Sequence, residues 1–158
     1  MKNLLVKLTV AAAALLVSAT CHAQKIFNSL ADNPNVESVF VGKAMMNMGI
    51  NMLGDDKDSQ DIYNAVNEIE SIEIISCEVP KEIAKIKSQA AKILAKLKLQ
   101  TLLETKEDGE TVVIYGHTPA NGETISDMVI ETTEKNEYSL IHIKGKINVK
   151  ALTSNQKK

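Results

Sequence analysis

The chain changes its hydrophobic period near residue 98, and this change constrains the fold more than any other feature. Between Pro80 and about Lys98, apolar residues recur every three or four positions, as on one side of an amphipathic helix. From Gln100 onward apolar and polar residues alternate, which is typical of half-buried β-strands. We therefore predict one helix followed by four strands, with turns at Lys106–Gly109, Pro119–Gly122 and Lys135–Asn136.

The first half of the chain predicts further helices and strands. Val36–Val41 predicts a strand, a Met-rich helix follows it, and Ile62–Ile69 has helical spacing. Ser71–Val79 is apolar on both faces when read as a strand, as expected inside a sheet. We predict an α+β fold with a mostly antiparallel sheet of five to six strands, because the later connections are short. The Pro80 helix and the Met-rich helix are expected to pack on one face of this sheet.

The first 23 residues have the order of a secretory signal peptide. Lys2 and Lys7 precede an apolar stretch of about 12 residues, and small residues stand before Gln24. This stretch is shorter than the roughly 20 residues of a membrane-spanning helix, so we predict no transmembrane segment. We expect export to the periplasm or the cell surface and cleavage after Ala23, with lipid attachment at Cys21 as the alternative. Residues 24–158 are then one α+β domain with a short polar C-terminal tail.

Composition argues against nucleic-acid binding and against a disulfide. The chain contains no Arg and no Trp, so it lacks guanidinium forks for phosphates and bases, and its few aromatic rings offer little stacking surface. Cys77 is the only cysteine after the predicted signal peptide, which excludes an internal disulfide in the exported chain. We interpret Cys77 as a buried thiol, because it lies in an apolar run, with a reactive thiol as the alternative.

No catalytic signature was found. The sequence contains no G-x-S-x-G motif, no H-E-x-x-H motif and no glycine-rich phosphate loop. We therefore assign no catalytic residue, no metal ligand and no cofactor from the sequence. An enzyme whose residues are dispersed along the chain stays an alternative.

Opposed charges give the first candidate binding residues. Residues 81–98 carry six Lys and one Glu, whereas residues 55–78 carry eight acids and one Lys. On the polar side of the predicted helix lie Lys81, Lys85, Lys92 and Lys96. An anionic envelope surface or an envelope protein is the partner that this face favours. An ordinary solvated helix face is the alternative interpretation.

Aromatic and imidazole side chains give the second set of candidates. We take Val112, Ile114, Ile141 and Ile143 as the inward face of the later strands. The opposite, outward face then carries Leu140 and the candidate residues Tyr115, His117, Tyr138 and His142. If the strands are neighbours, two imidazoles and two phenols can bind a metal or a small ligand together. Ordinary half-exposed strand residues are the alternative.

Two segments carry a resemblance to a known family. Ser38 to Met46 is a strand that runs into a Lys-x-Met helix, and Leu140 to Ile147 is a strand that closes in Gly-x-Ile. With the Ile-rich strand between them, the chain resembles the domain of unknown function 4252 family of small exported bacterial envelope proteins. The resemblance implies export and an α+β fold, and it carries over no catalytic residue.

These observations lead to one leading function hypothesis and two alternatives. The leading hypothesis is a non-catalytic binding or interaction module of the envelope. The alternatives are an enzyme without a recognisable motif and a self-assembling structural protein that pairs through its strand edges. The ligand, the partner and the oligomeric state stay open at this point.

Overall fold

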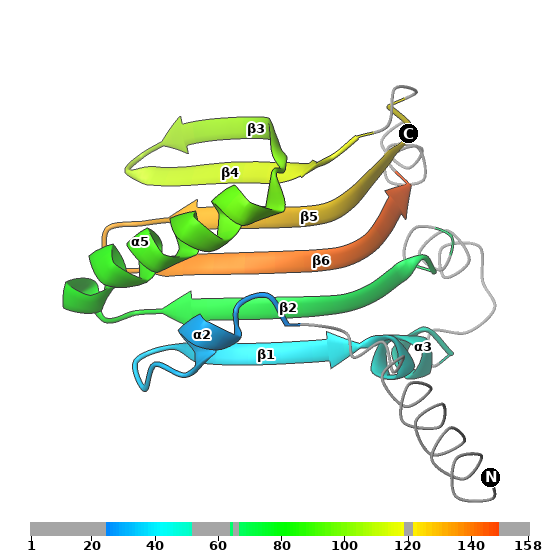
Figure 1. Ribbon diagram of the computed structural model, residues 1–158, viewed down its shortest axis with the longest axis horizontal. Helices are drawn as coiled ribbons and strands as arrows, with labels where there is room; N and C mark the ends of the chain where they lie inside the picture. The colour runs from blue at the N-terminus through cyan, green and yellow to red at the C-terminus, as the bar shows by residue number, and fades with distance from the viewer. Residues whose placement is uncertain (1–24, 52–63, 65–66, 119–121, 149–158) are drawn as a thin grey trace, which may run out of the picture.

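One open sheet organises the part of the chain that the computed structural model describes, which is residues 25–51, 64, 67–118 and 122–148 (Figure 1). The elements in chain order are α2 (Asn28–Ala31), β1 (Glu37–Gly42), α3 (Lys43–Asn51), β2 (Ile69–Cys77), α5 (Pro80–Leu97), β3 (Gln100–Glu107), β4 (Glu110–His117), β5 (Thr124–Thr133) and β6 (Tyr138–Asn148). The predicted signal peptide, Cys21 and the C-terminal tail lie outside the described residues. Half of the predicted helix at Ile62–Ile69 lies outside them too, and its last residue begins β2 instead.

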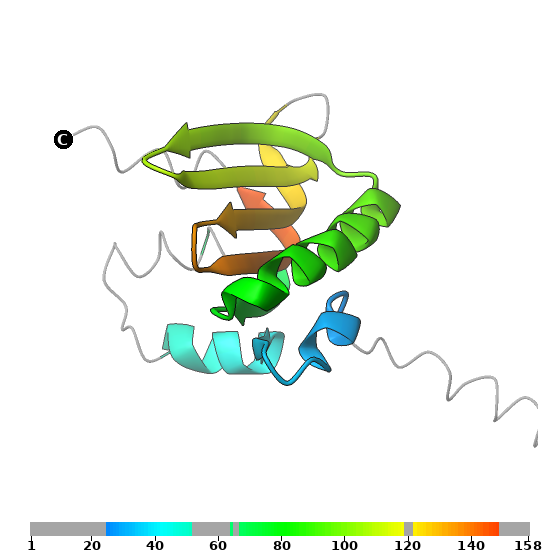
Figure 2. The same ribbon diagram turned by 90° about the vertical axis from the view of Figure 1, so that its left-hand side faces the viewer.

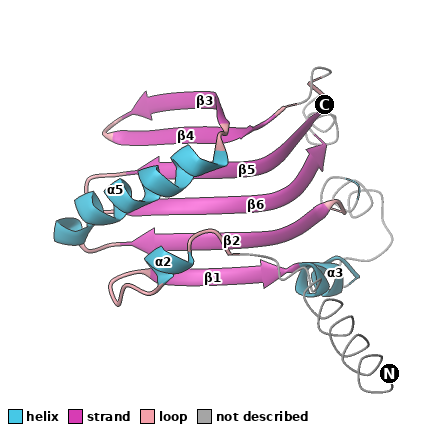
Figure 3. Ribbon diagram, viewed as in Figure 1, coloured by secondary structure: helices cyan, strands magenta, loops and turns pink. Residues whose placement is uncertain are grey.

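All six strands pair antiparallel, in the order β1-β2-β6-β5-β4-β3 (Figure 3). The hairpins predicted from Gln100 onward are present, and they make β3 to β6 a meander. Asp108 and Gly109 both have positive φ in the turn between β3 and β4, as a tight hairpin with right-handed twist requires. The two halves of the chain meet where β2 pairs with β6. An α+β fold with a six-stranded antiparallel sheet is therefore confirmed.

α5 is the helix that connects β2 to β3 across the sheet (Figure 1). Pro80 opens it, at a position where a missing N–H costs nothing, and Lys98 ends it in the left-handed conformation with φ of 52°. Eighteen residues give a helix of about 27 Å, enough to span the strands between β2 and β3. Its sheet-facing side buries Ile86 and Ala90 completely.

The core lies between α5, α2 and one face of the sheet. The sheet contributes several residues to this core, and three of them are fully buried aliphatic side chains, namely Ile75, Val129 and Leu140. Phe27 and Leu30 close the core from the α2 side, and both are fully buried. α2 itself is a four-residue helix that the sequence analysis did not predict.

α3 does not join α5, contrary to the expectation that both helices pack on one face. It follows β1 directly and lies beside β1 and β2, away from the core of α5 and α2. Figure 2 shows α5 and α2 on one side of the sheet and α3 toward the other side at the β1 edge. Met45 and Met48 are each 63% exposed, so α3 uses few of its methionines for packing.

The assignment of inward and outward faces to the later strands was wrong. Tyr138 and Leu140 are fully buried and His142 is 5% exposed, whereas Ile141 and Ile143 on the other face are only half-buried. α5 covers the face with the tyrosines, and the isoleucine face receives none of the described core. Period-two alternation separates two faces but does not say which one a helix covers.

Candidate functional site

Four of the five strand pairings shift register at one end of the sheet, and two of these shifts involve β5. The pairing of β4 with β5 shifts between Tyr115 and His117, and that of β5 with β6 shifts between Ser126 and Met128. Asp127 lies inside the second shift and has φ of 50°. A non-glycine residue in this conformation is strained by about 1–3 kcal/mol, and bulges of this kind often redirect side chains beside functional sites. This end of the sheet is therefore our candidate site.

A hollow of about 250 Å³ lies beside these irregularities. Its apolar wall consists of Ile26, Leu97 and Leu99, and its polar wall consists of His117, Asp127, His142 and Lys144. The volume is below the usual range of about 300–1,000 Å³ for ligand pockets, so it suits a small molecule. Four ionisable side chains beside three apolar ones can fix both the orientation and the apolar part of such a molecule.

His142 is the most buried of the ionisable groups in this hollow, with 5% exposure. The ring of Phe27 meets it edge to face, with 6.3 Å between the ring centroids. Burial lowers the pKa of His142 below its ordinary value, Lys144 acts in the same direction and Asp127 opposes both. The imidazole is therefore neutral at pH 7, with one nitrogen that donates and one that accepts a hydrogen bond.

Glu73 holds the backbone that forms one wall of the hollow. It pairs with His142 across β2 and β6, is 3% exposed, and lies under the start of α2. Its carboxylate accepts the N–H of Ile26 at 2.9 Å and the N–H of Phe27 at 3.2 Å. Burial raises the pKa of Glu73, while these two hydrogen bonds and the nearby Lys25 oppose the rise. Glu73 thus fixes Ile26 against the hollow through two backbone hydrogen bonds.

Lys144 supplies the positive charge of the hollow, and part of its side chain stays accessible to solvent. Its Nζ forms an ion pair with Glu70 at 3.2 Å, and the two side chains are 35% and 56% exposed. Exposed pairs of this kind contribute about 0.2–1 kcal/mol, because solvent screens them. A ligand with an acidic group can therefore compete with Glu70 for Lys144.

A second hollow, of about 290 Å³, lies under α5 and shares Leu99 with the first. Tyr115 and Glu131 form its polar wall, and Ala91, Leu94 and Ala95 of α5 form its roof. Glu131 is 8% exposed and accepts hydrogen bonds from the hydroxyls of Tyr115 and Tyr138, both at 2.8 Å. Burial and the carboxylate of Glu131 raise the pKa of both tyrosines, so both phenols stay protonated as donors.

The structure brings some of the predicted site residues together and separates others. His117 and His142 line one hollow although β5 lies between their strands. Tyr115 and Tyr138 meet through Glu131 of that intervening strand. The predicted helix residues Lys81, Lys85, Lys92 and Lys96 are all exposed on α5, and neither hollow has them in its wall.

Four polar residues of this region were not among the predicted site residues, namely Glu73, Asp127, Glu131 and Lys144. A weak signal existed for Asp127, because Asp is uncommon inside strands and interrupts the apolar run of β5. Glu73 and Glu131 gave no such signal, since a Glu at an alternate strand position reads as solvent-exposed. Only the pairing of β2 and β5 with β6 places them under the helices.

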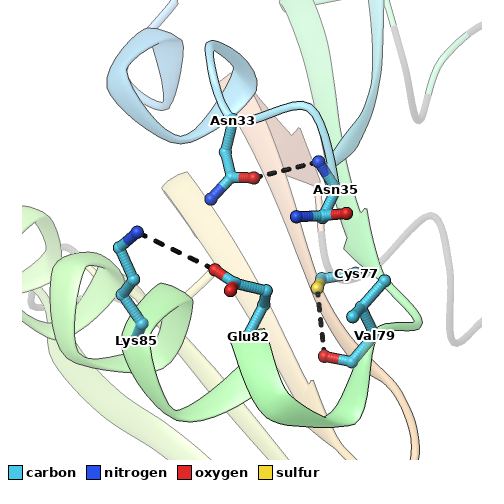
Figure 4. A network of polar contacts seen from close by, with 6 residues as sticks. All are labelled: Asn33, Asn35, Cys77, Val79, Glu82 and Lys85. Carbon is cyan, nitrogen blue, oxygen red and sulfur yellow. Dashed lines mark hydrogen bonds and ion pairs between the residues drawn. The ribbon is translucent and has the colours of Figure 1, made fainter.

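Cys77 takes no part in either hollow. It is 1% exposed at the end of β2, and its thiol lies 3.9 Å from the carbonyl oxygen of Val79 (Figure 4). The same view shows the ion pair of Lys85 with Glu82 at 3.8 Å on the first turns of α5. Cys77 is thus the buried thiol that the sequence predicted.

The described residues offer neither a metal-binding cluster nor a membrane-spanning helix. Residues 25–51, 64, 67–118 and 122–148 contain no cluster of three or more metal-ligating side chains in a suitable arrangement. In the same residues, no helix has both the length and the apolar character to cross a bilayer.

An open antiparallel sheet with one crossing helix and a polar hollow under that helix defines a small α+β domain. Residues 27–154 match the family model described as domain of unknown function (DUF4252), and the chain belongs to this family. The resemblance found in the sequence is therefore confirmed. Comparisons with curated proteins and with solved structures gave no match.

Proposed function

We propose that this chain is an exported, non-catalytic binding module that takes a small ligand in the 250 Å³ hollow. The observation that carries the proposal is the meeting of His117, Asp127, His142 and Lys144 beside an apolar wall. Strain at Asp127 supports it, because such strain is retained where a side chain must point in a special direction. The signal-like order of the first 23 residues supports export.

The wall chemistry favours a small zwitterionic ligand with an apolar group. Lys144 attracts an acidic group, Asp127 attracts a basic group, and Leu97 with Leu99 can cover an aliphatic part. Free amino acids with aliphatic side chains have this combination. They are the probes of choice for a first titration.

Titration of the isotope-labelled protein with L-leucine, followed by amide NMR shifts, tests this proposal. We expect shifts at the ends of β4, β5 and β6, and at least a tenfold loss of affinity in Asp127→Asn. Asp108→Asn is the matched control, because Asp108 is also an Asp with positive φ but lies in the turn between β3 and β4. No shift at the hollow with L-leucine or with other free amino acids would refute the ligand class. Equal losses in both variants would refute the site.

The same hollow supports a catalytic function as a second candidate. His142 is neutral at pH 7 for the reasons given above, and Asp127 and His117 line the same wall. A neutral imidazole and a carboxylate around one small space are suited to general acid–base chemistry. Mass spectrometry of a ligand before and after incubation distinguishes the candidates: turnover that His142→Asn abolishes while binding persists favours the enzyme.

The lysine side of α5 supports contact with an anionic envelope surface. Lys81, Lys85, Lys92 and Lys96 are exposed, and each lysine near such a surface contributes about 1 kcal/mol. Cosedimentation with phosphatidylglycerol vesicles at low and high salt measures this contact. The N-terminus of the protein recovered from cells, read by mass spectrometry, tests export and distinguishes a start at Gln24 from a lipid-bearing Cys21.

A further inference from the structure

The face of the sheet opposite α5 carries a continuous row of apolar side chains. The pairing registers place one residue of each strand in this row, in the order Val39, Ile74, Ile141, Ile130, Ile114 and Leu103. We call it the isoleucine row. Val39 and Leu103 at its ends are 53% and 49% exposed, and the four isoleucines are half-buried.

The rows on either side of the isoleucine row are also nearly uncharged. One is the apolar row of Val41, Ile72, Ile143 and Met128. The other, from β1 to β3, is Glu37, Ser76, Ser139, Thr132, Val112 and Thr105. Glu37, on the edge strand, is the one charged side chain of the three rows. An antiparallel sheet face that meets water is normally polar, so the two apolar rows have the composition of a covered surface, while the third row is polar but nearly uncharged.

None of the described helices supplies that cover. α5 and α2 lie on the opposite side of the sheet, and α3 lies at the β1 edge (Figure 2). Monomeric proteins seldom expose contiguous apolar surface beyond about 300–600 Å². At about 4.8 Å between strands and about 6.7 Å between rows, the sixteen residues of these rows cover about 510 Å², and the eleven apolar ones cover about 350 Å², a size at which an apolar patch is often functional.

Two observations favour a second copy of this chain as the occupant. The isoleucine row reads nearly the same from both ends, with four central isoleucines between two smaller or more flexible end residues. A two-fold axis that runs parallel to the strands, between two facing sheets and level with the middle of the row, places the row against its own copy. Ile141 then lies near the partner copy's β5, and Val39 lies near its β3. The three rows themselves carry almost no charge that would oppose a second copy.

The size of the face also fits a dimer. Two faces of about 510 Å² together remove about 1,000 Å² from water, before the corrugation of the side chains adds to it, and this is the size that a specific interface is expected to reach. We propose that two copies of this chain pack their isoleucine rows face to face and form a β-sandwich-like dimer. Sheets packed in this way lie about 10 Å apart. The dimer leaves both hollows free, because they lie on the other face, so it is independent of the proposed ligand site.

Sedimentation equilibrium of the purified protein over a dilution series tests the dimer. We expect a reversible monomer–dimer equilibrium in the unchanged protein. The double variant Val39→Lys, Leu103→Lys is expected to weaken it at least about tenfold, since it places like charges opposite each other across the interface. These two positions are 53% and 49% exposed, so lysine fits there in the folded monomer. Ala84→Lys with Ser88→Lys, at exposed positions on α5, is the matched control and is expected to leave the equilibrium unchanged.

Ile141→Thr is the second variant, and it keeps a β-branched side chain at the centre of the row while it removes apolar surface. We expect weaker association with an unchanged circular dichroism spectrum. A protein that is monomeric throughout the series would overturn the proposal. A dimer that survives all the face variants would overturn it as well and would indicate pairing through strand edges.

Discussion

The helix-covered face of the sheet holds buried polar groups, including Glu73, Glu131 and His142, whereas the opposite face holds a row of apolar side chains that no described helix covers. If apolar content alone decided which face is buried, the helix would cover the face with the isoleucines and leave the face with the polar groups exposed. The covered face tolerates Glu73 and Glu131 because both accept hydrogen bonds, and within the described residues no fully buried side-chain nitrogen or oxygen lacks a partner. Burial therefore depends on what packs against a face as much as on the residues that compose it.

The sharpest test of this comparison uses two neighbours on β6 that point to opposite faces. Leu140 is fully buried under α5, and Ile141 lies half-buried in the isoleucine row. We expect Leu140→Ala to lower the free energy of unfolding by about 3–4 kcal/mol and Ile141→Ala by about 1 kcal/mol in the monomer. Urea denaturation at a concentration where the protein is monomeric measures both. Equal losses would mean that the two faces are equally buried.

The polar groups of the covered face provide the next largest effect. Glu131→Ala leaves the hydroxyls of Tyr115 and Tyr138 without their shared acceptor, so we expect a loss of about 2–4 kcal/mol. Tyr115→Phe removes one donor alone and is expected to cost about 1 kcal/mol. Glu134→Ala, at an exposed position in the turn after β5, is the control and should stay within about 0.5 kcal/mol. Thermal unfolding of the three variants would contradict this ranking if Glu131→Ala behaved like the control.

The pH dependence of stability tests the buried imidazole of the same face. Because the pKa of folded His142 lies below the ordinary value of 6.5, the unfolded chain binds the proton more readily in the window between the two values. The free energy of unfolding should therefore fall as the pH decreases through about 6.5. His142→Asn should remove this part of the slope, and His117→Asn, at an exposed position, should keep it.

The difference between the two histidine variants isolates His142. Glu73 contributes in the opposite direction, because its raised pKa makes the folded state gain stability as the carboxyl becomes protonated. That contribution is common to both variants. Identical pH profiles for the unchanged protein and His142→Asn, from denaturant unfolding between neutral and mildly acidic pH, would refute the buried neutral imidazole.

The smallest effect on stability is expected on the outer side of α5, which belongs to neither face of the sheet. Replacement of Lys81, Lys85, Lys92 and Lys96 by Gln should change the free energy of unfolding by no more than about 0.5 kcal/mol per site, since exposed lysines contribute little. Vesicle cosedimentation of the same variant should decrease and lose its salt dependence. Unchanged cosedimentation would remove the lysines from the proposed function.

The elements with strong local signals were predictable. The period-3.6 pattern and Pro80 placed α5 within a residue of its observed bounds, and the alternation after Gln100 gave four strands joined by hairpins. α2 has only four residues, which is too short for a periodic signal, and it is held by contacts with distant residues such as Glu73. The position of α3 was not predictable, because its sequence allows packing on either side of the sheet.

The candidate site was predictable only in its residue types. The sequence placed Tyr115, His117, Tyr138 and His142 on one face, which is correct, but assigned that face to solvent. It also missed Asp127 and Glu131, because the bulge at Asp127 and the central place of β5 arise from strand pairing over long sequence separations. Local periodicity contains no information about either.

The sequence by itself determined the class of the fold, the helix that crosses the sheet and the two sets of side chains that alternate along each strand. These follow from backbone geometry and from the spacing of apolar residues, which are local properties. The tertiary structure decided which set α5 covers, that β2 joins β6, and that four ionisable side chains share one hollow. These features depend on contacts between residues far apart in the chain, and their free energy comes from burial and hydrogen bonds that exist only once the sheet has assembled.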